Sequence, residues 1–135
     1  MGSILIIDDE EDIRDALQMI LEGDGYDVKV ASDGNEAIEL QRKDPADLII
    51  TDIIMPGRDG ITTIRVIKEE FPATRIIAIS GGGGVQPTEY APEAITTTAY
   101  LAAAKEIGAD KVFTKPFERK DLIQAVDDLF GKNLH

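Results

Sequence analysis

Acidic residues follow two of the apolar runs in this sequence. Asp8 and Asp9 come directly after the run at residues 4–7, and Asp52 closely follows the run at 48–50. If these runs are the first and third strands of a parallel sheet, the carboxylates meet at the crevice where the strand order reverses. Carboxylates packed together repel one another unless a cation or a proton neutralises them. We therefore expect a divalent cation, and Mg²⁺ fits because it prefers oxygen ligands, commonly one or two carboxylates plus a phosphate.

A hydroxyl group and an ammonium group are expected at the same edge of the sheet. Ser80 ends a fourth apolar run, and Lys115 follows a fifth. A hydroxyl donor and a positive charge are suited to binding the oxygens of a phosphoryl group. Taken alone, each of these residues has a structural explanation, since acids are common at helix starts and turns and a lone lysine is usually solvated. Their joint occurrence at strand ends indicates phosphoryl-transfer chemistry.

Short apolar runs alternate along the chain with segments of helical periodicity. This alternation predicts an α/β fold in which a doubly wound, five-stranded parallel sheet is covered by five helices. We expect the flavodoxin-like strand order 2-1-3-4-5, which the alternation by itself leaves open. The predicted strands are Ile4–Asp8, Asp27–Ala31, Leu48–Asp52, Ile76–Ser80 and Lys111–Thr114, and the predicted helices are Asp12–Glu22, Gly34–Arg42, Ile61–Glu70, Thr98–Ile107 and Arg119–Phe130.

The chain length and the turn residues predict one domain with one unusual connection. At 135 residues, 1–135 is expected to form a single domain. The stretch Gly81–Thr97 begins with four glycines and is too long for an ordinary connection, so we predict an extended flexible loop. The glycines lack the spacing of a phosphate-binding loop. A flexible tail is expected from about residue 131.

Composition excludes several classes of function. The chain has 14 basic and 26 acidic residues and a formal net charge of −12, so we expect no direct binding to nucleic acid. It contains no cysteine and one histidine, His135, which excludes disulfides and zinc sites built from these ligands. No apolar run approaches the ~20 residues of a membrane-spanning helix, and no signal peptide is visible. We expect a cytoplasmic protein without membrane contact.

Four segments together resemble the motifs of the receiver domain of response regulators, the phosphorylation switch of two-component signalling. They are Ile6-Ile7-Asp8-Asp9-Glu10, Thr51-Asp52-Ile53-Ile54-Met55-Pro56-Gly57-Arg58-Asp59-Gly60, Ser80-Gly81 and Thr114-Lys115-Pro116-Phe117. The resemblance runs from about Ser3 to Phe130. It implies a stand-alone receiver that signals through contacts with other proteins.

The resemblance implies a metal site around the phosphoacceptor. Asp52 would accept the phosphoryl group and also bind Mg²⁺. Asp9 would bind the ion directly, Asp8 mainly through water, and the main-chain carbonyl of Ile54 would be a further ligand. The apolar side chain of Ile54 cannot hydrogen-bond an attacking water, which predicts slow hydrolysis of the phosphorylated form.

The resemblance also implies the donor and the extent of catalysis. A histidine kinase or a histidine phosphotransfer protein would supply the phosphoryl group. Ser80 and Lys115 would bind its oxygens, with a cis peptide bond before Pro116. The chain would catalyse only its own phosphorylation and dephosphorylation, so it is not expected to be an enzyme. It would be a monomer or form a weak dimer through the face made by the fourth helix, the fifth strand and the fifth helix.

The sequence departs from this family at the switch and in the loop Gly81–Thr97, which is longer than the family usually shows. In receivers the Ser80-type hydroxyl moves inward on phosphorylation, and an aromatic residue of the fifth strand follows it. Here that position holds Val112, and the neighbouring Phe113 is expected on the opposite side of the strand. We therefore hypothesise that the loop Gly81–Thr97 takes over part of the switch. The alternative is an insertion without a role in signalling.

Three other functions are consistent with parts of the pattern. An aspartyl phosphatase or phosphotransferase of the haloacid-dehalogenase type also uses a nucleophilic aspartate after a strand, but its motif asks for an acid where this chain has Ile54. A flavodoxin-like cofactor binder is disfavoured by the acids and by an aromatic content of 5%. A receiver that is never phosphorylated and serves as an adaptor would not need all five principal residues, namely Asp8, Asp9, Asp52, Ser80 and Lys115.

Overall fold

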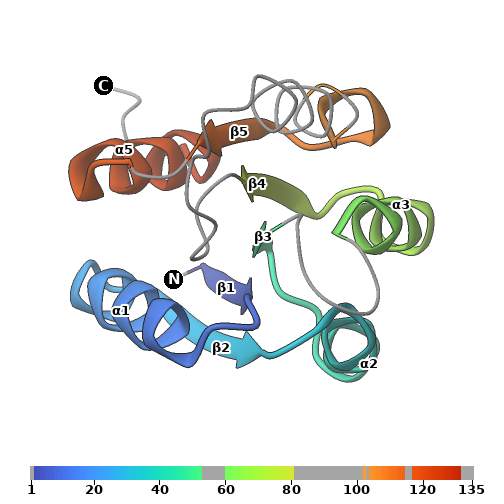
Figure 1. The fold of residues 1–135 in the computed structure, drawn as a ribbon, viewed down its shortest axis with the longest axis horizontal. Coiled ribbons are helices and arrows are strands. Elements are labelled where there is room, and N and C mark those ends of the chain that lie inside the picture. Colours follow the sequence, from blue (N-terminus) through green and yellow to red (C-terminus); the bar gives the residue numbers. More distant parts are fainter. Residues whose placement is uncertain (1, 53–59, 81–101, 103, 115–116, 132–135) are drawn as a thin grey trace, which may run out of the picture.

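The computed structural model describes residues 2–52, 60–80, 102, 104–114 and 117–131, and these form a sheet with helices on both faces (Figure 1). Residues 104–107 are also helical. The strands are β1 (Ser3–Ile7), β2 (Asp27–Ala31), β3 (Leu48–Asp52), β4 (Arg75–Ser80) and β5 (Lys111–Thr114), and the longer helices are α1 (Glu11–Gly23), α2 (Gly34–Lys43), α3 (Gly60–Glu70) and α5 (Arg119–Leu129).

All neighbouring strands pair in parallel, in the order β2-β1-β3-β4-β5. The predicted α/β fold with a flavodoxin-like sheet is therefore confirmed. The order reverses at β1, because the chain goes from β1 to β2 on one side and to β3 on the other. Helices α1 and α5 lie on one face of the sheet, and α2 and α3 lie on the other (Figure 1).

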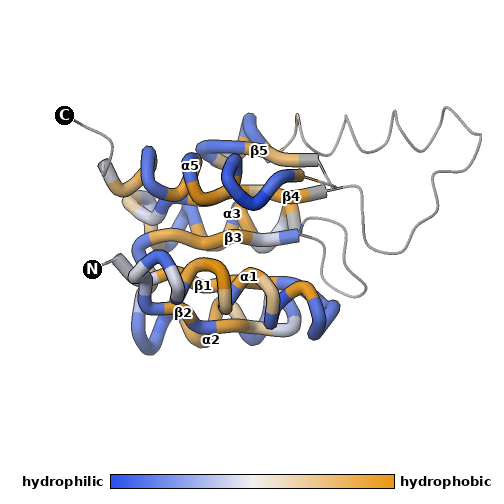
Figure 2. Tube along the Cα trace, turned by 90° about the vertical axis from the view of Figure 1, so that its left-hand side faces the viewer, coloured by the Kyte–Doolittle hydropathy of each residue, from blue (hydrophilic) through white to orange (hydrophobic). Residues whose placement is uncertain are grey.

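Two hydrophobic cores fill the space between the sheet and these helices. Alternate residues of β1 supply them: Ile4 and Ile6 pack in the core under α1 and α5, whereas Leu5 and Ile7 pack in the core under α2 and α3. This period of two is the pleat of a strand that is buried on both faces. Figure 2 shows β1, β3 and β4 as hydrophobic for most of their length. Continuous apolar runs are the expected sequence of such strands.

The predicted element bounds differ from the observed ones by at most one residue wherever the structure describes them. Strand β1 ends at Ile7 rather than at Asp8. The amide of Asp8 still donates to the carbonyl of Ala31 at 3.2 Å, but its carboxylate accepts the amide of Glu10 at 2.9 Å. This local hydrogen bond turns the chain out of the sheet toward α1. The predicted loop Gly81–Thr97 lies outside the described residues.

No helix in the described ranges is long and apolar enough to cross a membrane. The beginning of the predicted helix Thr98–Ile107 and the tail beyond residue 131 are not among the described residues. The single domain 1–135 stays a prediction.

Candidate functional site

The register of β1 against β3 places Asp8 and Asp52 at corresponding positions. Ile7 of β1 lies opposite Thr51 of β3, and the two aspartates are the next residues along these neighbouring strands. Both side chains are buried, with exposed fractions of 3% for Asp8 and 5% for Asp52. The sequence-based prediction that acids gather at the carboxyl ends of these two strands agrees with this register.

Three consecutive acids after β1 form a candidate metal centre, and in the part of the chain that the structure describes this group does not include Asp52. One carboxylate oxygen from each of Asp8, Asp9 and Glu10 can be chosen so that the three atoms lie within 4.8 Å of one another. Asp8 is buried, Glu10 is half-buried and Asp9 is exposed. Hard oxygen donors at this spacing fit a divalent cation such as Mg²⁺, and the open side leaves room for the waters that Mg²⁺ keeps.

The sequence analysis missed Glu10 as a candidate ligand. Glu10 belongs to the receiver-like segment Ile6–Glu10, but the sequence pattern did not single it out as a ligand. The signal was its adjacency to Asp8 and Asp9, since a turn directly after a strand brings consecutive side chains together. The hydrogen bond from the Glu10 amide to the Asp8 carboxylate closes that turn. The bond is a local turn contact, because the N-cap of α1 is Glu10 and this residue makes no side-chain capping bond.

The backbone around both aspartates is held by side chains. Thr51 is fully buried, and its hydroxyl donates to the main-chain carbonyl of Asp52 at 2.9 Å. On the other strand, Nη1 of Arg14 donates to the main-chain carbonyl of Asp8 at 2.7 Å. These contacts fix the peptide groups from which the two carboxylates project.

The pairing of β4 with β5 places Ser80 at the end of its strand, opposite Thr114. Ser80 ends β4 and lies opposite Thr114, the last residue of β5, and Lys115 follows Thr114 in the sequence. The main chain therefore brings Ser80 and Thr114 to the edge of the sheet that carries Asp52. The side chain of Ser80 and the residues Ile54, Lys115 and Pro116 lie outside the described part of the chain.

The family model of the response regulator receiver domain matches residues 4–127, which is nearly the whole chain. The chain belongs to this family. The matched range includes Asp8, Asp9, Asp52, Ser80 and Lys115.

Solved structures of receiver domains resemble this one closely. A response regulator receiver domain protein from Clostridium thermocellum is 28% identical with a TM-score of 0.82, and the match covers 98% of this chain and 96% of that one. The beryllofluoride-activated NtrC4 receiver domain dimer is 30% identical with a TM-score of 0.80, and 98% of both chains is covered. NtrX from Brucella abortus is 27% identical with a TM-score of 0.81, but this receiver spans only 27% of its length.

The fifth strand of this receiver carries its two predicted switch residues on opposite faces. Val112 packs against the core under α2 and α3, whereas Phe113 packs against the core under α1 and α5. The ring of Phe113 lies 5.5 Å from that of Phe117, measured between centroids. The expected placement of Phe113 across the strand from Val112 is therefore confirmed. An aromatic side chain is absent from the α3-facing side of β5 at this position.

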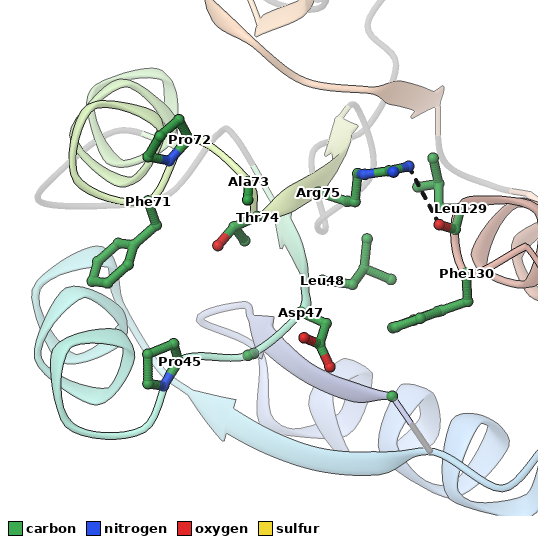
Figure 3. Close-up of a pocket in the computed structure, with 12 residues that line it drawn as sticks. Pro45, Asp47, Leu48, Phe71, Pro72, Ala73, Thr74, Arg75, Leu129 and Phe130 are labelled. Atoms are coloured by element: carbon green, nitrogen blue, oxygen red, sulfur yellow. Dashed lines mark hydrogen bonds between the residues drawn. The ribbon is translucent and has the colours of Figure 1, made fainter.

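A separate groove of about 560 Å³ lies at the opposite end of the sheet (Figure 3). Asp47 and Arg75 lie at the amino ends of β3 and β4, and Arg75 donates to the carbonyl of Leu129 at 3.3 Å across the groove. Of the candidate site residues that the structure describes, neither Asp52 nor any member of the Asp8–Glu10 group lines this groove. Asp52 ends the same strand whose beginning forms the groove, so the two are separated by the length of β3.

Proposed function

We propose that this receiver accepts a phosphoryl group on Asp52 in an Mg²⁺-dependent reaction and passes the signal on through protein contacts. The observation that supports this proposal best is the pairing of β1 with β3, which brings buried Asp52 next to the acidic cluster that begins at Asp8. The donor would be a histidine kinase or a histidine phosphotransfer protein. Receiver domains in general interact with these two classes of protein.

The proposed Mg²⁺ ligands are Asp8, Asp9, Asp52 and the carbonyl of Ile54, and Glu10 is close enough to contribute through water. When bound, the ion supplies positive charge that offsets the repulsion between the carboxylates and the negative phosphoryl oxygens. The donor set supports this assignment, because oxygen ligands from carboxylates and a main-chain carbonyl are the ligands that Mg²⁺ prefers.

In the proposed transfer, a carboxylate oxygen of Asp52 forms a bond to the donor phosphorus while the bond from phosphorus to the donor histidine nitrogen breaks. The electron pair of the broken bond stays on the imidazole, and an acyl phosphate remains on Asp52. Ser80 and Lys115 are proposed to bind the phosphoryl oxygens. Hydrolysis later adds water, releases inorganic phosphate and restores the carboxylate.

The proposed switch works without the usual aromatic residue of the fifth strand. Val112 is smaller than an aromatic side chain and is partly buried against the core. We propose that movement of Ser80 is transmitted through the β4–β5 pairing, in which Ser80 lies opposite Thr114 and Ala78 opposite Val112. The loop Gly81–Thr97 follows Ser80 directly and is the proposed second part of the switch.

The output is proposed to be a contact with a protein partner, made by the face that contains β5 and α5. The net charge of −12 favours a basic partner surface and disfavours direct contact with nucleic acid. The NtrC4 receiver is described as a dimer in its beryllofluoride-activated form, which supports a monomer or weak dimer that associates more strongly after activation. A cytoplasmic location is part of this proposal.

Intact-mass spectrometry with acetyl phosphate tests the function directly. The protein should gain one phosphoryl group when Mg²⁺ is present and none when the metal is chelated. The Asp52→Asn variant should gain none in either condition. If the wild-type protein stays unlabelled with Mg²⁺ under all donor concentrations, the receiver is an adaptor that acts without phosphorylation. Repeated turnover of a small phosphate ester would favour the phosphatase alternative.

A further inference from the structure

Arg14 makes an unusual contact for a residue near the start of a helix. It is the fourth residue of α1, and its amide donates to the carbonyl of Glu10 at 3.1 Å as in a regular helix. Its side chain reaches back past the helix start, and Nη1 donates to the main-chain carbonyl of Asp8 at 2.7 Å. The contact therefore joins the first turn of α1 to the end of β1.

This hydrogen bond is one of several contacts that hold Asp8 in place. The Asp8 amide donates to Ala31 of β2, the Asp8 carboxylate accepts from the Glu10 amide, and the Asp8 carbonyl accepts from Arg14. The acidic loop is thus tied to a neighbouring strand, to itself and to α1. Each tie limits how far the loop can move when its carboxylates repel one another.

The chemistry of the guanidinium suits this role. A hydrogen bond with an ionised donor is shorter and stronger than one between neutral groups, and the guanidinium stays charged at all ordinary pH values. Within the described residues, Arg14 makes no salt bridge. The side chain is half-buried, and it donates to the main-chain carbonyl of Asp8 rather than to an exposed carboxylate.

We propose that Arg14 is a positioning residue that holds the Asp8–Glu10 loop in the arrangement that binds the divalent cation. The inference rests on the proposed function, because it concerns the same metal centre. Groups that orient metal ligands without touching the metal commonly change metal affinity when they are removed. Arg14 acts on the ligands through the main chain of Asp8.

A competing electrostatic effect would change the affinity for Mg²⁺ in the opposite direction, so the two effects can be told apart by experiment. The positive charge of Arg14 near the site repels a cation, so removing it could strengthen Mg²⁺ binding. Positioning and repulsion therefore predict opposite changes for the variant Arg14→Gln, which loses both the charge and the reach of the side chain. Arg14→Lys keeps the charge and one donor, so it should restore part of the positioning.

The test is isothermal titration with Mg²⁺ in the absence of any phosphoryl donor, supported by the thermal unfolding of each metal-free variant. For Arg14→Gln the dissociation constant should rise by about tenfold, and for Arg14→Lys by a smaller factor. Arg42→Gln is the matched control, because Arg42 pairs with exposed Glu70 on α2 and α3, and its Mg²⁺ affinity should equal that of the wild type.

The outcomes separate the failure of this inference from that of the proposed function. If the wild-type protein shows no saturable Mg²⁺ binding, the proposed metal centre itself is wrong. If the wild type binds Mg²⁺ and Arg14→Gln binds it equally or more tightly, the positioning role is overturned while the centre stands. If Arg14→Gln does not fold, the comparison of Arg14→Lys with the wild type decides in the same way.

Discussion

Thr51 donates its buried hydroxyl to the main-chain carbonyl of Asp52 at 2.9 Å. The residue before the proposed phosphoacceptor thereby fixes the peptide group from which the reacting carboxylate extends. Correct placement of a nucleophile within a fraction of an ångström has large effects on rate. This relationship gives the first prediction.

Thr51→Val should slow phosphorylation of Asp52 by acetyl phosphate several-fold, because the valine cannot donate to the carbonyl of Asp52. The rate is measured by intact mass over time. Thr51→Ser is the matched control: it keeps the hydroxyl but loses a buried methyl group, at a cost of about 1 kcal/mol in unfolding free energy. The serine variant should therefore be less stable than the wild type and yet react at a similar rate. Equal phosphorylation rates for the valine variant and the wild-type protein would show that Thr51 does not position Asp52 for the reaction.

Gln41 on α2 should be essential for stability although it is a polar residue. Its side chain is fully buried, accepts from the amide of Ala46 at 2.9 Å, and donates to the Ala46 carbonyl at 3.1 Å and to the Thr74 hydroxyl at 3.2 Å. Gln41→Leu leaves both polar groups of Ala46 without these partners, so we expect a loss of about 2–4 kcal/mol in unfolding free energy. Urea unfolding gives this value.

The control for Gln41 is Gln124→Leu on α5. Gln124 is exposed and bonds to Asp128 one turn away, so its replacement should change the unfolding free energy by less than about 0.5 kcal/mol. If Gln41→Leu loses as little unfolding free energy as Gln124→Leu, the buried contacts of Gln41 contribute little to stability.

Tyr26 should make the stability of the fold depend on alkaline pH. Burial raises the pKa of the Tyr26 phenol, and the hydrogen bond to Asp127 with the charges of Asp127 and Asp24 raises it further. An unfolded tyrosine ionises near pH 10, at about its unperturbed value. The stabilising contribution is therefore complete below about pH 10 and is lost as the pH rises toward the raised pKa of the folded state.

Urea unfolding of the wild type and of Tyr26→Phe at about pH 8 and about pH 11 checks this contribution. The wild-type protein should lose more unfolding free energy between the two pH values than the phenylalanine variant does, because only the wild type has the Tyr26 phenol. Parallel losses in both proteins would assign the alkaline effect to other groups, such as the lysines.

Hydrogen exchange tests the proposed role of the loop Gly81–Thr97. Adding beryllofluoride and Mg²⁺, which mimic the phosphorylated state, should change the amide protection of this loop if it is part of the switch. The Asp52→Asn variant serves as the control and should show no change. Unchanged protection in the wild type, with clear changes elsewhere around Asp52, would favour an insertion without a signalling role.

The sequence predicts the sheet well because most of its strands have a strong local signature. Strands such as Leu48–Asp52 are buried along their whole length and read as apolar runs, so their ends and the acids that follow them can be found from the pattern alone. The strand order agrees with the expectation for such a chain. The position of Asp52 beside Asp8 follows from that order.

The side-chain contacts that refine the site and stabilise the fold have no such signature. The Arg14 guanidinium meets the Asp8 carbonyl only because the loop after β1 turns in one particular way, and an arginine on a helix is normally read as a solvated residue. Gln41 was likewise indistinguishable from an exposed helix residue. The hydrogen bond between Tyr26 and Asp127 joins residues 101 positions apart, and no local pattern can predict such a pair.

Mapping of the modified residue is the most direct test of the central claim that Asp52 is the phosphoacceptor. The protein is phosphorylated with acetyl phosphate and Mg²⁺ and then reduced with borohydride, which converts an aspartyl phosphate to homoserine, and the peptides are analysed by mass spectrometry. We predict homoserine at position 52 and at no other acid, and none when Mg²⁺ is withheld. Homoserine at Asp9 or another acid, or equal labelling of the Asp52→Asn protein, would contradict the account.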